Sequence, residues 1–135
     1  MLKFIQPPDW KAPKGYANGV LATGSTGGIV FTGGQIGWSN EQAFESDDFI
    51  AQCEKALGNV VAIVMQAGGQ ITDIVRLTWY ITDKQSYVTR QRELGDAYQR
   101  VMDRHFPAMT MVEVSALIED RALVEIEATA VITSA

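Results

Sequence analysis

The chain has few of the residues that bind metals or form covalent links. Its 135 residues include one cysteine, Cys53, and one histidine, His105. A single cysteine cannot form an internal disulfide, and one histidine without cysteine or histidine neighbours is a poor start for a metal site. We therefore expect neither a disulfide framework nor a bound metal.

Runs of basic residues and long apolar runs are also missing. Eleven Lys and Arg face sixteen Asp and Glu, and the formal net charge is −5. Binders of nucleic acid or of anionic membranes carry clustered positive charge, so neither partner is expected. The first residues, MLKFIQPPDW, lack the apolar core of a secretory signal, and no stretch of about 20 apolar residues follows. The expected location is the cytoplasm.

What is present is typical of one folded domain over residues 1–135. Hydrophobic residues make up 47% of the chain and charged residues 20%, without repeats or a linker. Spacing and turn residues predict strands at 19–23, 28–35, 74–82, 109–114 and 123–133, and helices at 47–67 and 87–106. Ser46 or Asp47 could cap the first helix. The order ββαβαββ predicts an α+β fold with a mixed sheet.

This order leaves one face of the predicted sheet uncovered. Right-handed crossovers place both helices on the same face. The strands are nevertheless apolar on both sides, as in Ile29-Val30-Phe31 and Trp79-Tyr80-Ile81. An apolar face of this size calls for a partner, and packing of identical sheets favours a closed ring of copies.

The last strand, VEIEATAV at Val124–Val131, carries two carboxylates. In an extended strand Glu125 and Glu127 share one face, while Val124 and Ile126 point to the other. Such a pair indicates either a chemical site or a wet strand face, and the residues alone favour neither.

Other reactive residues have plainer interpretations. Cys53 lies on the apolar side of a predicted helix, which suits an inert buried thiol. His105, near a helix end, is better explained as a terminal or surface residue than as a base. Met109 and Met111 share a strand face and suit core filling. Gly24–Gly28 (GSTGG) lies between two strands, which indicates a turn and not a phosphate cradle.

Four motifs give the chain a family resemblance over nearly its whole length. KGYANGV, TGGQIG, PAMTMVEV and VEIEATAV resemble the Rid superfamily, also called YjgF-like or L-PSP proteins. The resemblance implies a chorismate-mutase-like fold and a homotrimer whose sheets face inward as a barrel, with three pockets at the subunit interfaces.

The best-known branch, RidA, hydrolyses enamines and imines such as 2-aminoacrylate to the keto acid and ammonia, without metal or cofactor. By resemblance the catalytic glutamate falls on Glu125 and the tyrosine of the first motif on Tyr16. The backbone of Gly33 and Gly34 would complete the pocket. Glu127 would be a structural partner, bonded to a hydroxyl or to a cation of a neighbouring subunit.

The chain departs from RidA where the substrate carboxylate would bind. RidA has PAR followed by Ser-Cys, whereas this chain has Met109 and Met111 at the arginine and cysteine positions, and Gly33 replaces a serine. Without the arginine fork a 2-imino acid would lose roughly 2 to 5 kcal/mol of anchoring. We expect weak or no activity on 2-aminoacrylate, and Arg76 and Arg121 are poorly placed substitutes. A floor of two methionines suits a less polar ligand.

Two functions remain open. The first is an imine or enamine deaminase whose substrate lacks an α-carboxylate or carries it elsewhere. The second is a non-catalytic trimer that binds a small metabolite in the same cleft. The resemblance also brings a ribonuclease name, but negative net charge and a single histidine disfavour that activity.

Overall fold

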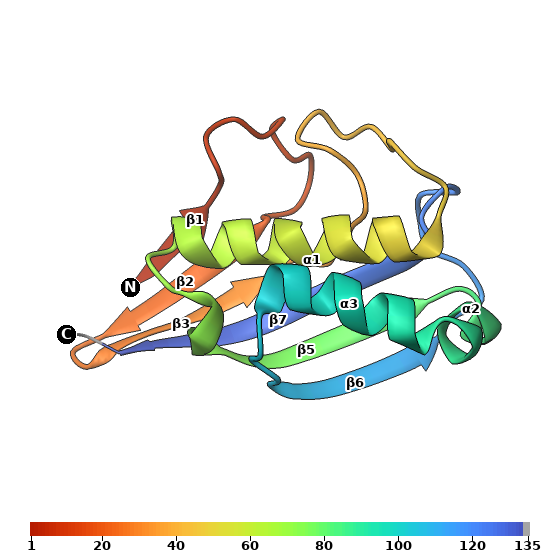
Figure 1. The fold of residues 1–135 in the computed structure, drawn as a ribbon. Coiled ribbons are helices and arrows are strands. Elements are labelled where there is room, and N and C mark those ends of the chain that lie inside the picture. Colours follow the sequence, from red (N-terminus) through yellow and green to blue (C-terminus); the bar gives the residue numbers. More distant parts are fainter. Residues whose placement is uncertain (134–135) are drawn as a thin grey trace.

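The computed structural model describes residues 1–133 as one mixed sheet with helices packed against it (Figure 1). The strands are β1 (Leu2–Ile5), β2 (Gly19–Gly24), β3 (Gly27–Thr32), β4 (Gln35–Ile36), β5 (Ile74–Ile81), β6 (Ala108–Glu113) and β7 (Val124–Thr133). The helices are α1 (Phe49–Gln66), α2 (Lys84–Thr89) and α3 (Gln91–Met102), with a 3₁₀ turn η1 (Ile71–Asp73). The predicted α+β class and mixed sheet are confirmed.

The last strand lies near the middle of the sheet. Within residues 1–133 the strand order is β1-β2-β3-β7-β5-β6, and the short β4 also pairs with β7. Only β5 and β6 run parallel, joined by the crossover through α2 and α3, and the other pairs are antiparallel. Strand β7 therefore pairs with β3, β4 and β5, which is more partners than any other strand of the described residues has.

Helix α1 covers one face of the sheet. Its N-cap is Asp48, whose carboxylate accepts from the Ala51 N–H at 3.0 Å, so the predicted caps, Ser46 and Asp47, were wrong by one or two residues. The helix ends before Gly68, whose φ of +95° is a conformation that favours glycine. Its buried side packs on β7, β4 and β3 with Leu57, Val60, Ile63 and Val64, which are all fully buried.

The single cysteine belongs to this core. Cys53 has no exposed surface, and burial raises the pKa of its thiol well above the ordinary range. A thiol that stays protonated is a weak nucleophile. The prediction of a buried, inert Cys53 is confirmed.

The structure differs from the predicted elements in three places. The helix expected over 87–106 is two helices, because Arg90 leaves the helical conformation and its guanidinium pairs with Asp48 and Glu93, each at 2.7 Å. The strand expected over 28–35 is divided into β3 and β4, because the Gly33 N–H bonds to the Asn18 carbonyl outside the ladder. The edge strand β1 was not expected, since four residues give too little pattern.

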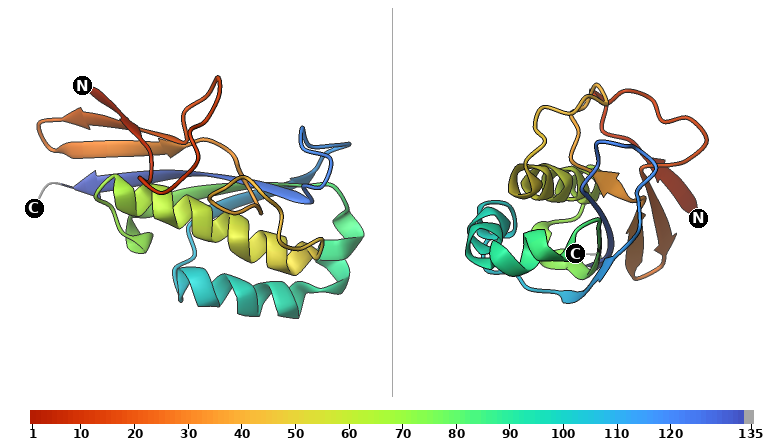
Figure 2. Two further views of the ribbon diagram at one scale, coloured as in Figure 1. Left: turned by 90° about the horizontal axis from the view of Figure 1, so that it is seen from above. Right: turned by 90° about the vertical axis from the view of Figure 1, so that its right-hand side faces the viewer.

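The face of the sheet opposite the helices stays uncovered. Figure 2 shows α1 and α3 on the same side of the sheet. On the other side lie large apolar side chains that are 39% to 74% exposed: Phe4, Ile29, Phe31 and Val131. Their strand pairings place them side by side across β1, β2, β3 and β7. We call this surface, together with the outward side chains of β7 and β5, the open face.

Within residues 1–133, none of the helices combines the length and the apolar character of a membrane-spanning segment.

Candidate functional site

Strand β7 divides its side chains between the two faces of the sheet. Val124, Ile126 and Ala128 are buried under the helices, whereas Glu125 and Glu127 are half-buried on the open face. This is the alternation that the sequence predicts. The two carboxylates therefore share one surface that is neither core nor bulk solvent.

The Glu125 carboxyl group lies directly over the backbone of Gly34. Residue Ile36 of β4 pairs with Glu125 across the ladder, so the turn before β4 passes beneath the acid. A methyl group at Gly34 would lie 2.6 Å from Glu125 Oε2 and 2.7 Å from its Cδ. The absence of a side chain at position 34 therefore leaves the space that the carboxyl group occupies, and a Cβ there would require the Glu125 side chain to shift.

Burial and charge both act on the ionisation of Glu125. Partial desolvation raises the pKa of its carboxyl group, and the neighbouring Glu127 carboxylate raises this pKa further. A carboxyl group with a raised pKa holds its proton to higher pH than an ordinary glutamate and is better matched to proton transfer near neutrality.

Glu127 has a partner that sequence reasoning missed. The Tyr80 hydroxyl donates to Glu127 Oε1 at 2.8 Å, and this bond to a carboxylate raises the pKa of Tyr80. Tyr80 of β5 stands beside Glu125 in the ladder, so it can reach the next acid along β7. Of the two partners expected for Glu127, a hydroxyl is the one observed. The register of β5 against β7, which sequence does not give, was the missing signal.

Two of the family motifs meet next to Glu125. Asn18 accepts the Gly33 N–H at its carbonyl oxygen, at 2.6 Å, and its side chain accepts from Gln35 Nε2 at 3.3 Å. Asn18 and Gln35 are buried, so these bonds hold the first motif against the turn that carries Gly33 and Gly34. Tyr16, two residues before Asn18, is 50% exposed, and its hydroxyl accepts from Gln42 Nε2 at 3.4 Å.

The two methionines lie on the other face. Met109 and Met111 of β6 are the ladder partners of Leu77 and Trp79, whose side chains are buried on the helix side. With α3 they line a cavity of about 400 Å³. Within one chain the structure thus groups Gly33, Gly34 and Glu125 at one place and sets Met109 and Met111 at another, while the Tyr16 hydroxyl is bonded to Gln42.

The arginines named as possible substitutes do not reach the methionines. The Arg121 Nε donates to Asp47 at 3.0 Å, and its guanidinium lies 5.3 Å from the centre of the Phe44 ring. Arg76 is exposed, and its ladder partner Thr129 belongs to the carboxylate side of β7. Neither cation therefore replaces the missing arginine fork beside Met109.

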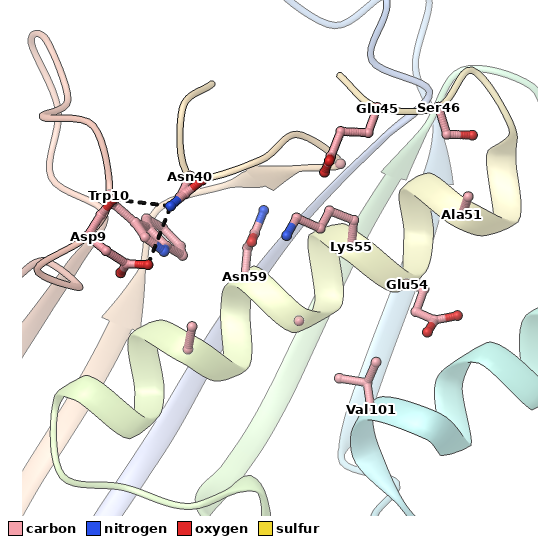
Figure 3. A pocket seen from close by; sticks show the side chains of 13 residues that line it. Asp9, Trp10, Asn40, Glu45, Ser46, Ala51, Glu54, Lys55, Asn59 and Val101 are labelled. Atoms are coloured by element: carbon pink, nitrogen blue, oxygen red, sulfur yellow. Dashed lines mark hydrogen bonds between the residues drawn. The ribbon is translucent and has the colours of Figure 1, made fainter. Parts of the chain in front are cut away.

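A larger cavity of about 850 Å³ lies along α1, away from the predicted residues. Figure 3 shows Lys55 and Glu45 facing each other above the helix, with Asn40 donating to Asp9 nearby. The Asn59 amide in its wall already donates to the carbonyl oxygens of Ile36 and Trp38. None of the catalytic or substrate-binding residues predicted from the sequence lines this cavity.

The potential metal ligands are dispersed. Within residues 1–133, no three His, Cys, Asp or Glu side chains gather in a way that could hold a metal ion. The ring of His105 lies beyond the end of α3, with its Nε2 2.7 Å from the Ile74 carbonyl oxygen.

The fold and the sequence both match known proteins. Residues 9–132 match the family described as Endoribonuclease L-PSP. A RutC family protein of Haemophilus influenzae is 35% identical over 121 residues, covering 90% of this chain and 92% of that protein. The 2-iminobutanoate/2-iminopropanoate deaminase of Salmonella typhimurium is 36% identical over 108 residues, covering 78% and 80%.

Solved structures give the same result. The E. coli TdcF structure with bound serine superposes with a TM-score of 0.77 at 30% identity, covering 96% of this chain and 98% of that one. The E. coli YjgF gene product has a TM-score of 0.77 at 32% identity, with the same coverage. These matches place the chain in one class of small α+β proteins that share this mixed sheet and its helices. The chain belongs to the Rid superfamily, the YjgF-like L-PSP proteins.

Proposed function

We propose that the protein is an imine or enamine deaminase whose substrate carries no α-carboxylate. One observation carries this proposal. A half-buried glutamate, Glu125, is held over Gly34 on the open face with its pKa raised. A relative of 36% identity is named as a deaminase of two 2-imino acids, which supports the reaction type.

The reaction needs little beyond a positioned water and a proton carrier. An imine carbon is electrophilic, so a water oxygen adds to it while Glu125 takes a proton from that water. Glu125 passes this proton to the nitrogen, which gives a carbinolamine. The carbinolamine hydroxyl then gives its proton to Glu125, which transfers it to the nitrogen. The C–N bond breaks with its electron pair on nitrogen as the C=O bond forms, and ammonia leaves the carbonyl product. No oxidant or reductant enters, and a carboxyl group with a raised pKa suits both proton transfers.

The substrate class follows from Met109 and Met111. A thioether offers no hydrogen-bond donor, and an arginine fork would have supplied two charge-assisted bonds to a carboxylate. The cavity beside these methionines is lined by side chains without charge. The free-energy cost of moving from water into this cavity is smaller for an uncharged substrate than for a 2-imino acid.

We further propose that the site is completed between subunits of a homotrimer. Glu125 lies on the open face and Met109 on the helix side of the same sheet, so one chain cannot place both against one small ligand. Exposed Phe4 and Phe31 on the open face support association of the sheets. Tyr16, which is exposed and lies two residues before the Asn18 that bonds to the Gly33 turn, would close the cleft.

The test compares two imines that differ only in the carboxylate. An L-amino-acid oxidase makes the 2-imino acid from phenylalanine, and an amine oxidase makes the carboxylate-free imine from phenethylamine. We expect the protein to speed carbonyl release from the second imine well above the spontaneous rate, and to act weakly on the first. The Glu125→Ala variant should act on neither.

The result that overturns the proposal is equally definite. If neither imine is hydrolysed faster with the protein than without it, and Glu125→Ala behaves like the wild type, the chain is not a deaminase of this class. The non-catalytic trimer would then be the better account of the cleft.

A further inference from the structure

The cavity between α3 and β6 has uncharged walls. Its sides come from β5, β6, α2, α3 and the segment after α3, and none of its lining side chains is ionic at neutral pH. Its volume, about 400 Å³, is within the range of pockets that hold small molecules. The cavity along α1 differs, because Asp9, Glu45, Glu54 and Lys55 line it.

Stacked aromatic rings form one wall. The rings of Tyr98 and Phe106 are 5.3 Å apart and 13° from parallel, and Trp79 lies 6.4 Å from Tyr98. The Tyr98 hydroxyl donates to the His105 carbonyl at 2.5 Å, so its proton is already used. Burial raises the pKa of Tyr98 to about 12, and the ring stays uncharged at neutral pH.

Trp79 contributes the unusual group. Its indole Nε1 is the buried side-chain nitrogen for which residues 1–133 provide no hydrogen-bond partner. The side chain is 3% exposed and lines the cavity from β5. A buried donor without an acceptor destabilises a fold, so the presence of this N–H group calls for an explanation.

Flexible side chains line the same cavity as Trp79. Met111 is the ladder partner of Trp79, and Met109 stands two residues earlier on the same face. Methionine has an unbranched side chain that adapts to the shape of a ligand. A ligand that displaces the methionine thioethers can therefore bring an acceptor to the indole N–H.

We infer that this cavity binds a flat, uncharged group with one hydrogen-bond acceptor, such as an aryl imine or aryl ketone, and that the acceptor bonds to Trp79 Nε1–H. The inference rests on the proposed function, because it names the substrate group that this half of the site receives. The stacked rings hold the flat part, and the indole selects for the acceptor. A carboxylate finds no cation here and is rejected.

Binding of acetophenone, an aryl ketone, tests the inference without any turnover. Calorimetric titration should show binding to the wild type that is about tenfold tighter than binding of ethylbenzene, which has no acceptor. Trp79→Phe keeps a ring and removes the donor. It should bind acetophenone about tenfold more weakly and should no longer distinguish the two probes.

A glycine pair supplies a matched control. Gly95 lines the cavity from α3, and nothing lies within 4 Å of the position its Cβ would take. Gly95→Leu should fill the space and abolish binding, while better helix propensity keeps the fold stable. Gly58→Leu makes the same change in α1 beside the other cavity, where its Cβ also has open space, and should leave binding unchanged.

The outcomes separate this inference from the deaminase proposal. If acetophenone does not bind, or binds equally to wild type and Trp79→Phe, the inference is wrong even where imines are hydrolysed. If acetophenone binds as expected while no imine is turned over, the cavity stands and the deaminase proposal fails.

Discussion

On one face of the sheet, helices exclude water and pack apolar side chains to near-complete burial. On the other face, two carboxylates, a tyrosine hydroxyl and exposed apolar side chains have no helices over them. Strand β7 serves both, since Ile126 is fully buried while its neighbour Glu125 is half-buried. The two-residue period of a strand lets adjacent positions carry stability and chemistry separately.

Strand β5 repeats this division with two aromatic residues. Trp79 faces the helices and lines the cavity beside Met111, whereas Tyr80 donates to Glu127 on the open face. Substitutions at neighbouring positions should therefore have effects of different kinds. A change on the open face should alter turnover, and a change in the buried core of the covered face, outside the α3–β6 cavity, should alter folding.

The largest expected effect is on turnover, from Glu125→Gln. Removing the proton carrier should lower the rate of imine hydrolysis by about 10² to 10⁴. Stability should not fall. Because the folded-state pKa of Glu125 is raised, its favourable contribution is present at low pH and is lost as pH rises from the ordinary glutamate range through that pKa. At pH 7 the glutamine therefore removes a charge that destabilises the folded state. The free energy of unfolding, measured in urea, should be no lower than that of the wild type.

The complementary change on the covered face is Ile126→Ala. Deleting a fully buried isoleucine should lower the free energy of unfolding by about 2 to 5 kcal/mol. Turnover per folded molecule should remain close to that of the wild type. A loss of turnover without a loss of stability would break the division between the two faces.

A change at the edge of the covered face tests the substrate class. Met109→Arg adds the missing fork and should raise activity on the phenylalanine-derived 2-imino acid by about tenfold or more. Met109→Leu keeps a similar apolar volume and should give no gain. Equal rates for both variants would mean that this position does not meet the substrate.

The smallest effect is expected from Glu127→Gln. It keeps an acceptor for Tyr80 but removes the charge that helps to raise the pKa of Glu125. Turnover that needs ionised Glu125 should then appear at lower pH. The acidic limb of the pH–rate profile should therefore shift to lower pH. Partial burial, the larger cause, remains, and the limb should stay above that of an ordinary glutamate.

Much of this arrangement could be predicted from local pattern. The period of two in VEIEATAV predicts which face each β7 side chain takes, and the three- and four-residue spacing predicts α1 and the burial of Cys53. These features depend on neighbours in sequence. The site positions Gly33, Gly34 and Tyr16 are instead predicted from the family motifs.

The rest depends on contacts between distant segments. The break at Arg90 is stabilised by a bond to Asp48, 42 residues earlier, and no local pattern signals it. The Tyr80–Glu127 bond follows from the register of β5 on β7. The unpartnered Trp79 nitrogen is visible only once its surroundings are placed.

We propose a shared site, in which the open face of one copy meets the α3–β6 cavity of another. It can be tested by combining two inactive variants. Glu125→Gln lacks the acid, and Gly95→Leu fills the cavity. The two are co-expressed with different tags, and trimers that carry both tags are isolated.

In a cyclic trimer of mixed composition, one interface in three joins an intact Glu125 to an intact cavity, so about a third of wild-type turnover should return. The account predicts this recovery with the phenethylamine-derived imine, measured beside each variant alone. Doubly tagged assemblies that are no more active than the separate variants would contradict it.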